Sequence, residues 1–165
     1  MADLDLLDFQ ILNILKTNSQ KPLKEIAEQL DSKASTIHAR IKKLEQKGII
    51  KNYTIYIDYN IIGYPLVAFI MLNFDKTETN LPQDEVAKQM ANLPIVQEVH
   101  LIAGEYDIIL KVTAKDIDDL GQFVTKTLKK IKGVGSSRTF VSLNKIKEYN
   151  QDPFLINQIT DEQNI

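Results

Sequence analysis

The spacing of apolar residues in the first fifty positions constrains the fold most, because they recur every three or four residues in three short runs. That spacing places the apolar residues on one face of a helix. The runs predict a helix at about 6–17, a second at about 23–30, and a third that ends at Gly48, since glycine enters the left-handed region at little cost. Three short helices with a tight turn between the last two form a helix-turn-helix.

A strongly basic segment coincides with the third helix. Between Lys33 and Lys51 the chain has six basic residues and one acidic residue, Glu45, although its formal net charge is −2. This local excess of cations is typical of a surface that contacts DNA phosphates, but a solvated lysine-rich helix face has the same composition. The outward side chains of the helix favour DNA, because they are short, polar or cationic and fit a major groove about 12 Å wide.

The candidate DNA-binding residues lie on or beside this third helix. They are Lys33, Ser35, Thr36, His38, Ala39, Arg40, Lys42, Lys43 and Lys51. Arg40 has two interpretations, since it lies near the inner edge that Ile37 and Ile41 form. It either pairs with an acidic residue of the first helix or binds a DNA phosphate. The sequence therefore predicts double-stranded DNA as a partner.

After the third helix, apolar and polar residues alternate from Ile49 to Asp58, which predicts a strand. Gly63-Tyr64-Pro65 interrupts the alternation. We expect residues 49–63 to form a strand and a linker that joins two domains.

From Leu66 onward the pattern is one of short strands and two helices. Strands are predicted at 67–74, 95–102, 106–113 and 136–143. One helix follows Asn80–Pro82, and the other is capped by Asp116 and ends at Gly133. The order β-α-β-β-α-β is that of a ferredoxin-like domain. The chain is therefore expected to be an α+β protein, with a helix-turn-helix followed by a ferredoxin-like domain.

The first strand of this second domain is apolar on both of its faces. Val67, Phe69 and Met71 alternate with residues that are equally apolar. Two helices cover only one face of a four-stranded sheet, and an uncovered apolar face is larger than monomers usually expose. We expect a second copy of the chain to cover it, so that the domain dimerises.

Four motifs follow one another along the chain. They are Leu4–Leu12, the segments Ile26–Leu30, Thr36–Glu45 and Gly48–Ile50 taken together, Gly104–Asp107, and Gly133-Val134 with Ser137 and Thr139. Over about residues 4–148, these motifs resemble the opening helix, the helix-turn-helix, the Gly-x-Tyr-Asp turn and the final strand of the Lrp/AsnC family of prokaryotic transcription regulators.

The resemblance implies a sequence-specific regulator that forms dimers, often assembled into tetramers or octamers. It also implies a second domain that binds a small effector, usually an amino acid, between dimers. The implied effector-binding residues are Gly104, Glu105, Tyr106, Asp107, Ser137 and Thr139. From the residues alone, segment 104–107 is first of all a tight hairpin turn. Its exposed backbone groups and carboxylate can also hold the head group of an amino acid, and the resemblance adds weight to that second interpretation.

One segment departs from the family pattern. Where the family usually has Leu-Gly-Leu-Ser, this chain has Leu30-Asp31-Ser32-Lys33. We expect Asp31 to adopt the left-handed conformation of the family's glycine. Capping of the third helix is expected to shift to Ser32 or Asp31, and Lys33 is a candidate for a phosphate contact.

Four parts are expected along the chain. They are a DNA-binding domain at 1–50, a strand and linker at 51–65, an effector-binding and dimerisation domain at 66–148, and a tail at 149–165.

Several other classes of protein are disfavoured. The chain has no cysteine and two histidines, one in each domain, so we expect no metal site and no cofactor. It has no apolar run of membrane-spanning length, and we expect a cytoplasmic protein. An enzyme or a stand-alone small-molecule-binding module on the ferredoxin-like domain is the alternative. It is the weaker one because no nucleophile–base pair or P-loop is present.

Overall fold

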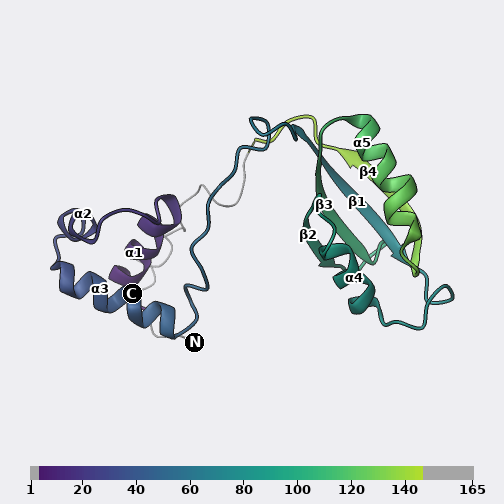
Figure 1. Cartoon of the computed structure of the whole chain (residues 1–165). Coiled ribbons are helices and arrows are strands. Elements are labelled where there is room, and N and C mark those ends of the chain that lie inside the picture. The colour runs from purple at the N-terminus through teal and green to yellow at the C-terminus, as the bar shows by residue number, and fades with distance from the viewer. Residues whose placement is uncertain (1–3, 147–165) are drawn as a thin grey trace. The chain divides into compact units, whose positions relative to one another are not determined.

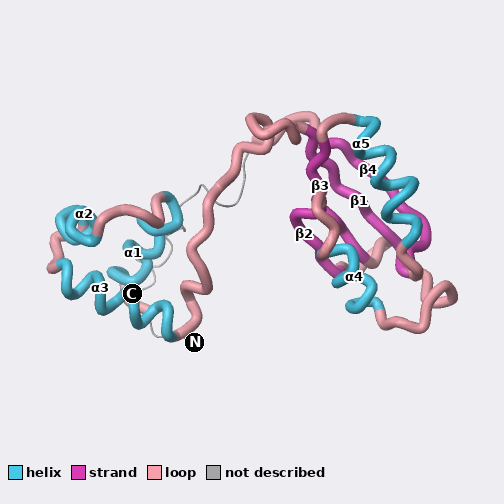
Figure 2. The backbone as a smooth tube through the Cα atoms, in the orientation of Figure 1, coloured by secondary structure: helices cyan, strands magenta, loops and turns pink. Residues whose placement is uncertain are grey.

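The computed structural model describes residues 4–146, which form two units (Figures 1 and 2). The first unit runs to Tyr56 and the second from Ile57 to Lys145. The expected tail at 149–165 lies outside the described residues, as do the last two positions of the expected domain at 66–148.

The first unit contains the three expected helices. They are α1 (Leu6–Thr17), α2 (Leu23–Gln29) and α3 (Ala34–Gln46). A reciprocal capping box opens α1, in which the Asp5 carboxylate accepts from the Asp8 N–H at 3.0 Å and the Asp8 carboxylate accepts from the Asp5 N–H at 3.3 Å. The helices enclose a small core. It consists of Ile11, Ile14, Ile26, Ala27, Ile37, Ile41 and Leu44.

The turn between α2 and α3 confirms one prediction and corrects another. Asp31 has φ 47°, so it adopts the left-handed conformation that we expected. The Ser32 N–H then donates to the Ala27 carbonyl at 2.9 Å and closes the end of α2. The prediction that Ser32 or Asp31 caps α3 is wrong. Lys33 occupies the N-cap position without a side-chain cap, because α3 begins only at Ala34, after Asp31 and Ser32 have closed α2.

Gly48 ends α3 as predicted. Its φ is 69°, and its N–H donates to the Glu45 carbonyl at 2.9 Å. The Ile49 N–H donates to the Leu44 carbonyl at 3.0 Å, which completes a Schellman closure of the helix. This closure directs the chain away from the axis of α3.

The predicted strand after Gly48 is wrong for the described chain. Residues 51–58 form no strand, and a turn follows at 59–63. The alternation of apolar and polar residues is present, but a strand also requires a neighbour for its ladder of hydrogen bonds. The described residues supply no such ladder for this segment.

The second unit is a four-stranded antiparallel sheet with two helices. Its elements are β1 (Leu66–Phe74), α4 (Gln83–Ala91), β2 (Val96–Leu101), β3 (Ile108–Ala114), α5 (Ile117–Gln122) and β4 (Val134–Val141). The strand order β2-β3-β1-β4 places the first and third strands in the centre, which is the predicted ferredoxin-like arrangement (Figure 1).

The two helices pack on the same face of this sheet. Even-numbered β1 and β3 residues, such as Ile70 and Leu110, are fully buried there against Met90 of α4 and Leu120 of α5. Asp116 caps α5 as predicted, because its carboxylate accepts from the Asp119 N–H at 2.8 Å. The chain then continues through a wider π-type turn at 123–127 and a 3₁₀ turn at 128–130.

The opposite face of the sheet has an apolar centre. Phe69 lies between Lys111 on β3 and Phe140 on β4. Phe69 is 37% exposed and Phe140 is 48% exposed. Neither helix covers this face, as the strand pattern predicted.

Candidate nucleic-acid interface and effector turn

The exposed side of α3 collects most of the predicted DNA-binding residues. Ile37, Ile41 and Leu44 are buried in the first unit, which turns the rest of the helix to solvent. The exposed residues on that side are Ser35, Thr36, His38, Ala39, Lys42 and Lys43. Lys33 is exposed directly before the helix, and Lys51 is exposed five residues after its end. Eight of the nine candidates are therefore exposed on α3 or close to it along the chain.

Arg40, the ninth candidate, points to α1. Its Nη1 lies 2.5 Å from an Asp5 carboxylate oxygen and 3.1 Å from an Asp8 carboxylate oxygen. The Asp8 side chain is 3% exposed. Burial raises the pKa of Asp5, but the Asp8 N–H and the Arg40 guanidinium outweigh it and hold that pKa below 3.8. The same two carboxylates raise the pKa of Arg40. The guanidinium thus ties the middle of α3 to the start of α1.

The predicted effector turn lies between β2 and β3. Tyr106 and Asp107 are half-buried, whereas Gly104 and Glu105 are exposed. The Asp107 carboxylate accepts from the Phe74 N–H at 2.8 Å, where β1 ends. One oxygen of this carboxylate therefore holds the turn against β1. The exposed turn groups that remain for a ligand are the backbone of Gly104 and the side chain of Glu105.

Asn73 and Gln83 hold the same turn, and no sequence pattern indicated their role. The Asn73 amide donates to the Glu105 carbonyl at 2.9 Å and accepts from the Ser136 hydroxyl at 2.9 Å. The Gln83 amide donates to the Asp107 carbonyl at 3.2 Å. Neither residue belongs to a motif, and a single amide in a strand or helix carries no sequence signal for such a contact.

Within one chain, the predicted effector residues of β4 are not beside the turn. Ser137 pairs with Leu72 and Thr139 with Ile70, so β1 separates both residues from β3. Ser137 is half-buried and Thr139 is exposed. Asn73 of β1 nevertheless links the neighbouring Ser136 hydroxyl to the Glu105 carbonyl of the turn.

A surface hollow of about 590 Å³ lies at the same end of the sheet as the turn but does not include it. It is lined by Thr77, Glu78, Thr79, Asn80, Leu81, Gln89, Lys130, Ile131 and Lys132. Across residues 4–146, no three His, Cys, Asp or Glu side chains are grouped so that they could hold a metal ion. The same part of the chain contains no helix long and apolar enough to span a membrane.

Two family models match the chain. A winged helix-turn-helix DNA-binding model matches residues 4–51, and the Lrp/AsnC ligand binding domain matches residues 67–152. An uncharacterized HTH-type transcriptional regulator of Pyrococcus horikoshii is 39% identical over 145 residues, which are 88% of this chain and 96% of the relative. The HTH-type transcriptional regulator FL11 of the same organism is 34% identical, over 91% of this chain and 96% of its own.

Solved structures show the same fold over nearly the whole chain. A transcriptional regulator of Neisseria meningitidis, in complex with L-Met, is 25% identical with a TM-score of 0.82, over 92% of this chain and 97% of that one. AsnC of E. coli is 26% identical with a TM-score of 0.79, over 88% of this chain and 96% of that one. With a DNA-binding helix-turn-helix followed by a ligand-binding domain of this type, the chain belongs to the Lrp/AsnC family of transcription regulators.

Proposed function

We propose that this protein represses or activates promoters by placing α3 in the major groove of a specific DNA sequence. The exposed side of α3 carries this proposal, because it is mostly polar and cationic while its other side is buried. Thr36, His38 and Ala39 are short enough to approach base edges, and Lys43 and Lys33 are placed to bind phosphates. The relatives are named HTH-type transcriptional regulators, which supports the same function.

Arg40 is assigned to the structure of the domain rather than to DNA. Its guanidinium bonds two carboxylates of the α1 capping box, and one of them is buried. If the guanidinium moved away to bind a phosphate, the buried Asp8 carboxylate would lose its counter-charge. Lys42 and Lys51 remain phosphate candidates, together with Ser35.

The experiment for this proposal is selection of duplexes from a random pool, followed by anisotropy against random competitor DNA at fixed salt. Two copies bound to one site place their recognition helices about one duplex turn apart, roughly 34 Å, or a multiple of it. A near-palindromic site is therefore expected. No enriched sequence and no specific complex at micromolar protein would contradict the proposal.

The second domain is proposed to bind an amino acid at the turn 104–107. The match to a ligand-binding domain supports this, and so does the L-Met complex of the Neisseria neighbour. The exposed Gly104 backbone and Glu105 carboxylate offer groups for a zwitterion, while Asp107 positions the turn. Tyr106 is proposed to line the same site, and Ser137 and Thr139 to contribute from a second chain.

A thermal-shift screen of the twenty amino acids at millimolar concentration tests the effector proposal. At least one amino acid is expected to raise the melting temperature of the second unit. Glu105→Gln is expected to reduce that shift. Glu78→Gln is the control, because it removes an equal charge from the surface hollow, which residues 104–107 do not line, and it is expected to leave the shift unchanged. The absence of a shift with every amino acid would contradict the proposal.

Self-association is proposed through the open face of the sheet. Phe69 and Phe140 are apolar and exposed there, and a second copy would remove both from water. Light scattering at micromolar concentration is expected to give at least a dimer. Phe140→Asp is expected to shift the mass toward the monomer, and a monomeric wild-type chain would contradict the proposal.

The remaining parts of the function follow from the same family membership. We propose a non-enzymatic regulator located in the cytoplasm, where its DNA targets are. Effector binding between dimers is proposed to favour one assembly over another, and the assembly then sets the spacing of recognition helices along DNA.

A further inference from the structure

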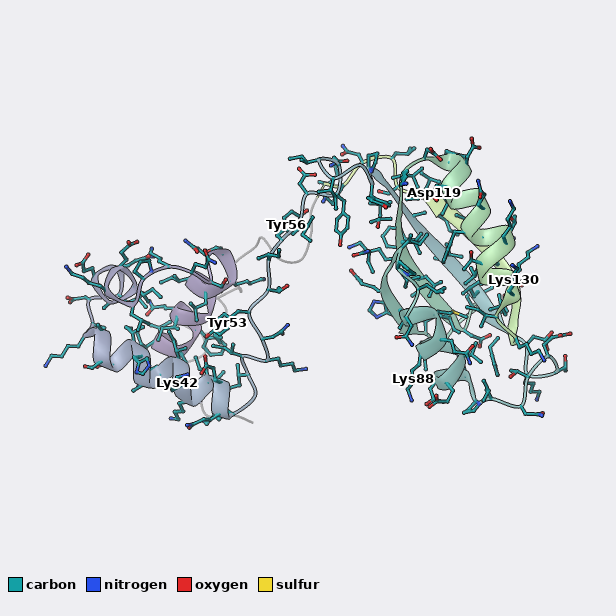
Figure 3. The ribbon with its side chains drawn as sticks, in the orientation of Figure 1. Lys42, Tyr53, Tyr56, Lys88, Asp119 and Lys130 are labelled. Atoms are coloured by element: carbon teal, nitrogen blue, oxygen red, sulfur yellow. The ribbon has the colours of Figure 1, made fainter. Side chains whose placement is uncertain are left out.

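Glu45 connects the recognition helix to the segment that follows it. One carboxylate oxygen accepts from the Lys42 Nζ at 2.8 Å, and the other accepts from the Tyr53 hydroxyl at 2.9 Å. Lys42 lies on the exposed side of α3, and Tyr53 lies on the segment that leads to the second unit, which begins at Ile57 (Figure 3). Both oxygens of the one acidic residue between Lys33 and Lys51 are therefore engaged.

The hydrogen bond from Tyr53 makes this pair more than an ordinary surface ion pair. An exposed pair at i and i+3 on a helix contributes little, because both side chains lose rotamer freedom to form it. Tyr53 holds the carboxylate in one position, so that the cost of ordering Glu45 is shared by two bonds. The Glu45 side chain is 28% exposed and that of Lys42 is 57% exposed, which leaves the ammonium in reach of a phosphate.

The titration behaviour of the two groups agrees with this geometry. The bond to Lys42 and then that to Tyr53 lower the pKa of Glu45. Burial, followed by the bond to Glu45, raises the pKa of Tyr53 to about 12. At neutral pH Glu45 is therefore a carboxylate, and Tyr53 is a neutral phenol that donates to it.

We propose that Tyr53 and Glu45 form a clamp that withholds the Lys42 ammonium from DNA phosphates. The inference rests on the proposed DNA-binding function and adds a regulation of it. A phosphate competes with Glu45 for Lys42, and the competition is harder while Tyr53 holds Glu45 in place. Because Tyr53 lies in the last residues of the first unit, just before the second unit begins at Ile57, a change in the path of residues 51–56 releases the clamp and adds one cation to the recognition surface.

A double-mutant cycle on duplex binding tests the clamp. Glu45→Gln is expected to tighten binding to any duplex and to steepen the slope of log K against log salt by up to about 0.9, the value for one added phosphate contact. Over a fourfold increase in salt, the affinity of Glu45→Gln is therefore expected to fall by roughly a threefold larger factor than that of the wild-type protein. Tyr53→Phe, which removes only the hydroxyl, is expected to change the slope in the same direction by a smaller amount.

The control is the same substitution without the lysine. In a Lys42→Ala background, Glu45→Gln is expected to leave the salt slope unchanged. Glu28→Gln removes an equal charge from α2, where Glu28 pairs with Lys24, and is also expected to leave the slope unchanged. Circular dichroism of each variant reports whether α3 is intact.

Three outcomes would overturn the inference. The first is an equal change of the salt slope by Glu45→Gln with and without Lys42, and the second is an equal change of the slope by Glu28→Gln. The third is weaker DNA binding by a folded Glu45→Gln variant, which would show that Glu45 contacts a base or holds α3. In each of them the wild-type protein still binds DNA and the proposed function stands. Absence of duplex binding by the wild-type protein would instead refute the proposed function, and the inference with it.

Discussion

Replacing Arg40 with alanine tests whether this residue holds the domain together or binds DNA. The substitution leaves the Asp8 carboxylate, 3% exposed, without its cation. Breaking a fully buried ion pair by removing one partner costs about 3–5 kcal/mol. Here the Arg40 side chain is 30% exposed, and the Asp8 carboxylate still accepts from the Asp5 N–H in the variant. We therefore expect the substitution to lower the free energy of unfolding by about 2 kcal/mol. Loss of the pair with the half-exposed Asp5 adds little to this value.

This loss is large for a unit of about fifty residues. At roughly 4–8 °C for each kcal/mol in a small domain, the first unit is expected to melt about 10 °C lower. Amide hydrogen exchange of α1 and α3 in a urea series measures the free energy of unfolding of this unit separately from that of the second. Arg138→Ala removes the same side chain from β4 and is expected to leave the first unit unchanged.

DNA binding under folding conditions completes the test. If the structural role is correct, Arg40→Ala keeps the wild-type salt slope once the folded fraction is taken into account. An unchanged stability together with a slope reduced by about 0.9 would refute the reasoning, because it would show that Arg40 contacts a phosphate instead.

Other predictions follow from single contacts. The pKa of Asp5 lies below 3.8 in the folded chain, so its stabilising contribution is present above pH 3.8 and is lost as the pH falls through the folded value. Urea unfolding is expected to show a small decrease in the free energy of unfolding of the first unit over that pH range. No decrease would show that the capping box is absent. Gly133→Ala is expected to destabilise the second unit by about 2 kcal/mol, because φ is 92° and the new Cβ would lie 2.7 Å from a Thr79 methyl group. Gly121→Ala on α5 meets nothing within 4 Å and is expected to stabilise the same unit by about 0.5–1 kcal/mol. Equal shifts of the melting temperature for the two variants would contradict both predictions. Asp107→Ala leaves the Phe74 N–H without its acceptor and is expected to cost about 1–2 kcal/mol in chemical denaturation, whereas a neutral result would show that water replaces the carboxylate.

Sequence periodicity predicted the elements whose apolar faces are buried within one chain. The helices of the first unit and the order β-α-β-β-α-β of the second are of this kind, since Ile37 or Leu110 can be buried only in one orientation of its element. The prediction for residues 49–58 was wrong because alternation specifies two faces but supplies no neighbouring strand. The prediction of the α3 cap was wrong because Asp31 and Ser32 close α2 and α3 begins only at Ala34, so that Lys33 is its N-cap.

The site was predictable in its location and less so in its contacts. Motifs marked α3 and the turn at 104–107, but contacts between distant elements decide what each side chain does. Arg40 bonds Asp5 and Asp8, which confirms one of the two interpretations that the sequence left open for it. Asn73 bonds Glu105 and Tyr53 bonds Glu45, and neither of these two pairs has a spacing that a sequence pattern reveals.

The most direct test of the central claim, that α3 binds DNA, is the salt dependence of duplex binding by Lys43→Ala. Lys43 is exposed on α3, and Lys88, the matched control, lies on α4 in the second unit. We predict that Lys43→Ala weakens binding to every duplex and reduces the salt slope by about 0.9 for each protomer in contact, while Lys88→Ala changes neither. An unchanged slope for Lys43→Ala, or an equal loss for Lys88→Ala, would contradict the assignment of α3 as the DNA-binding helix.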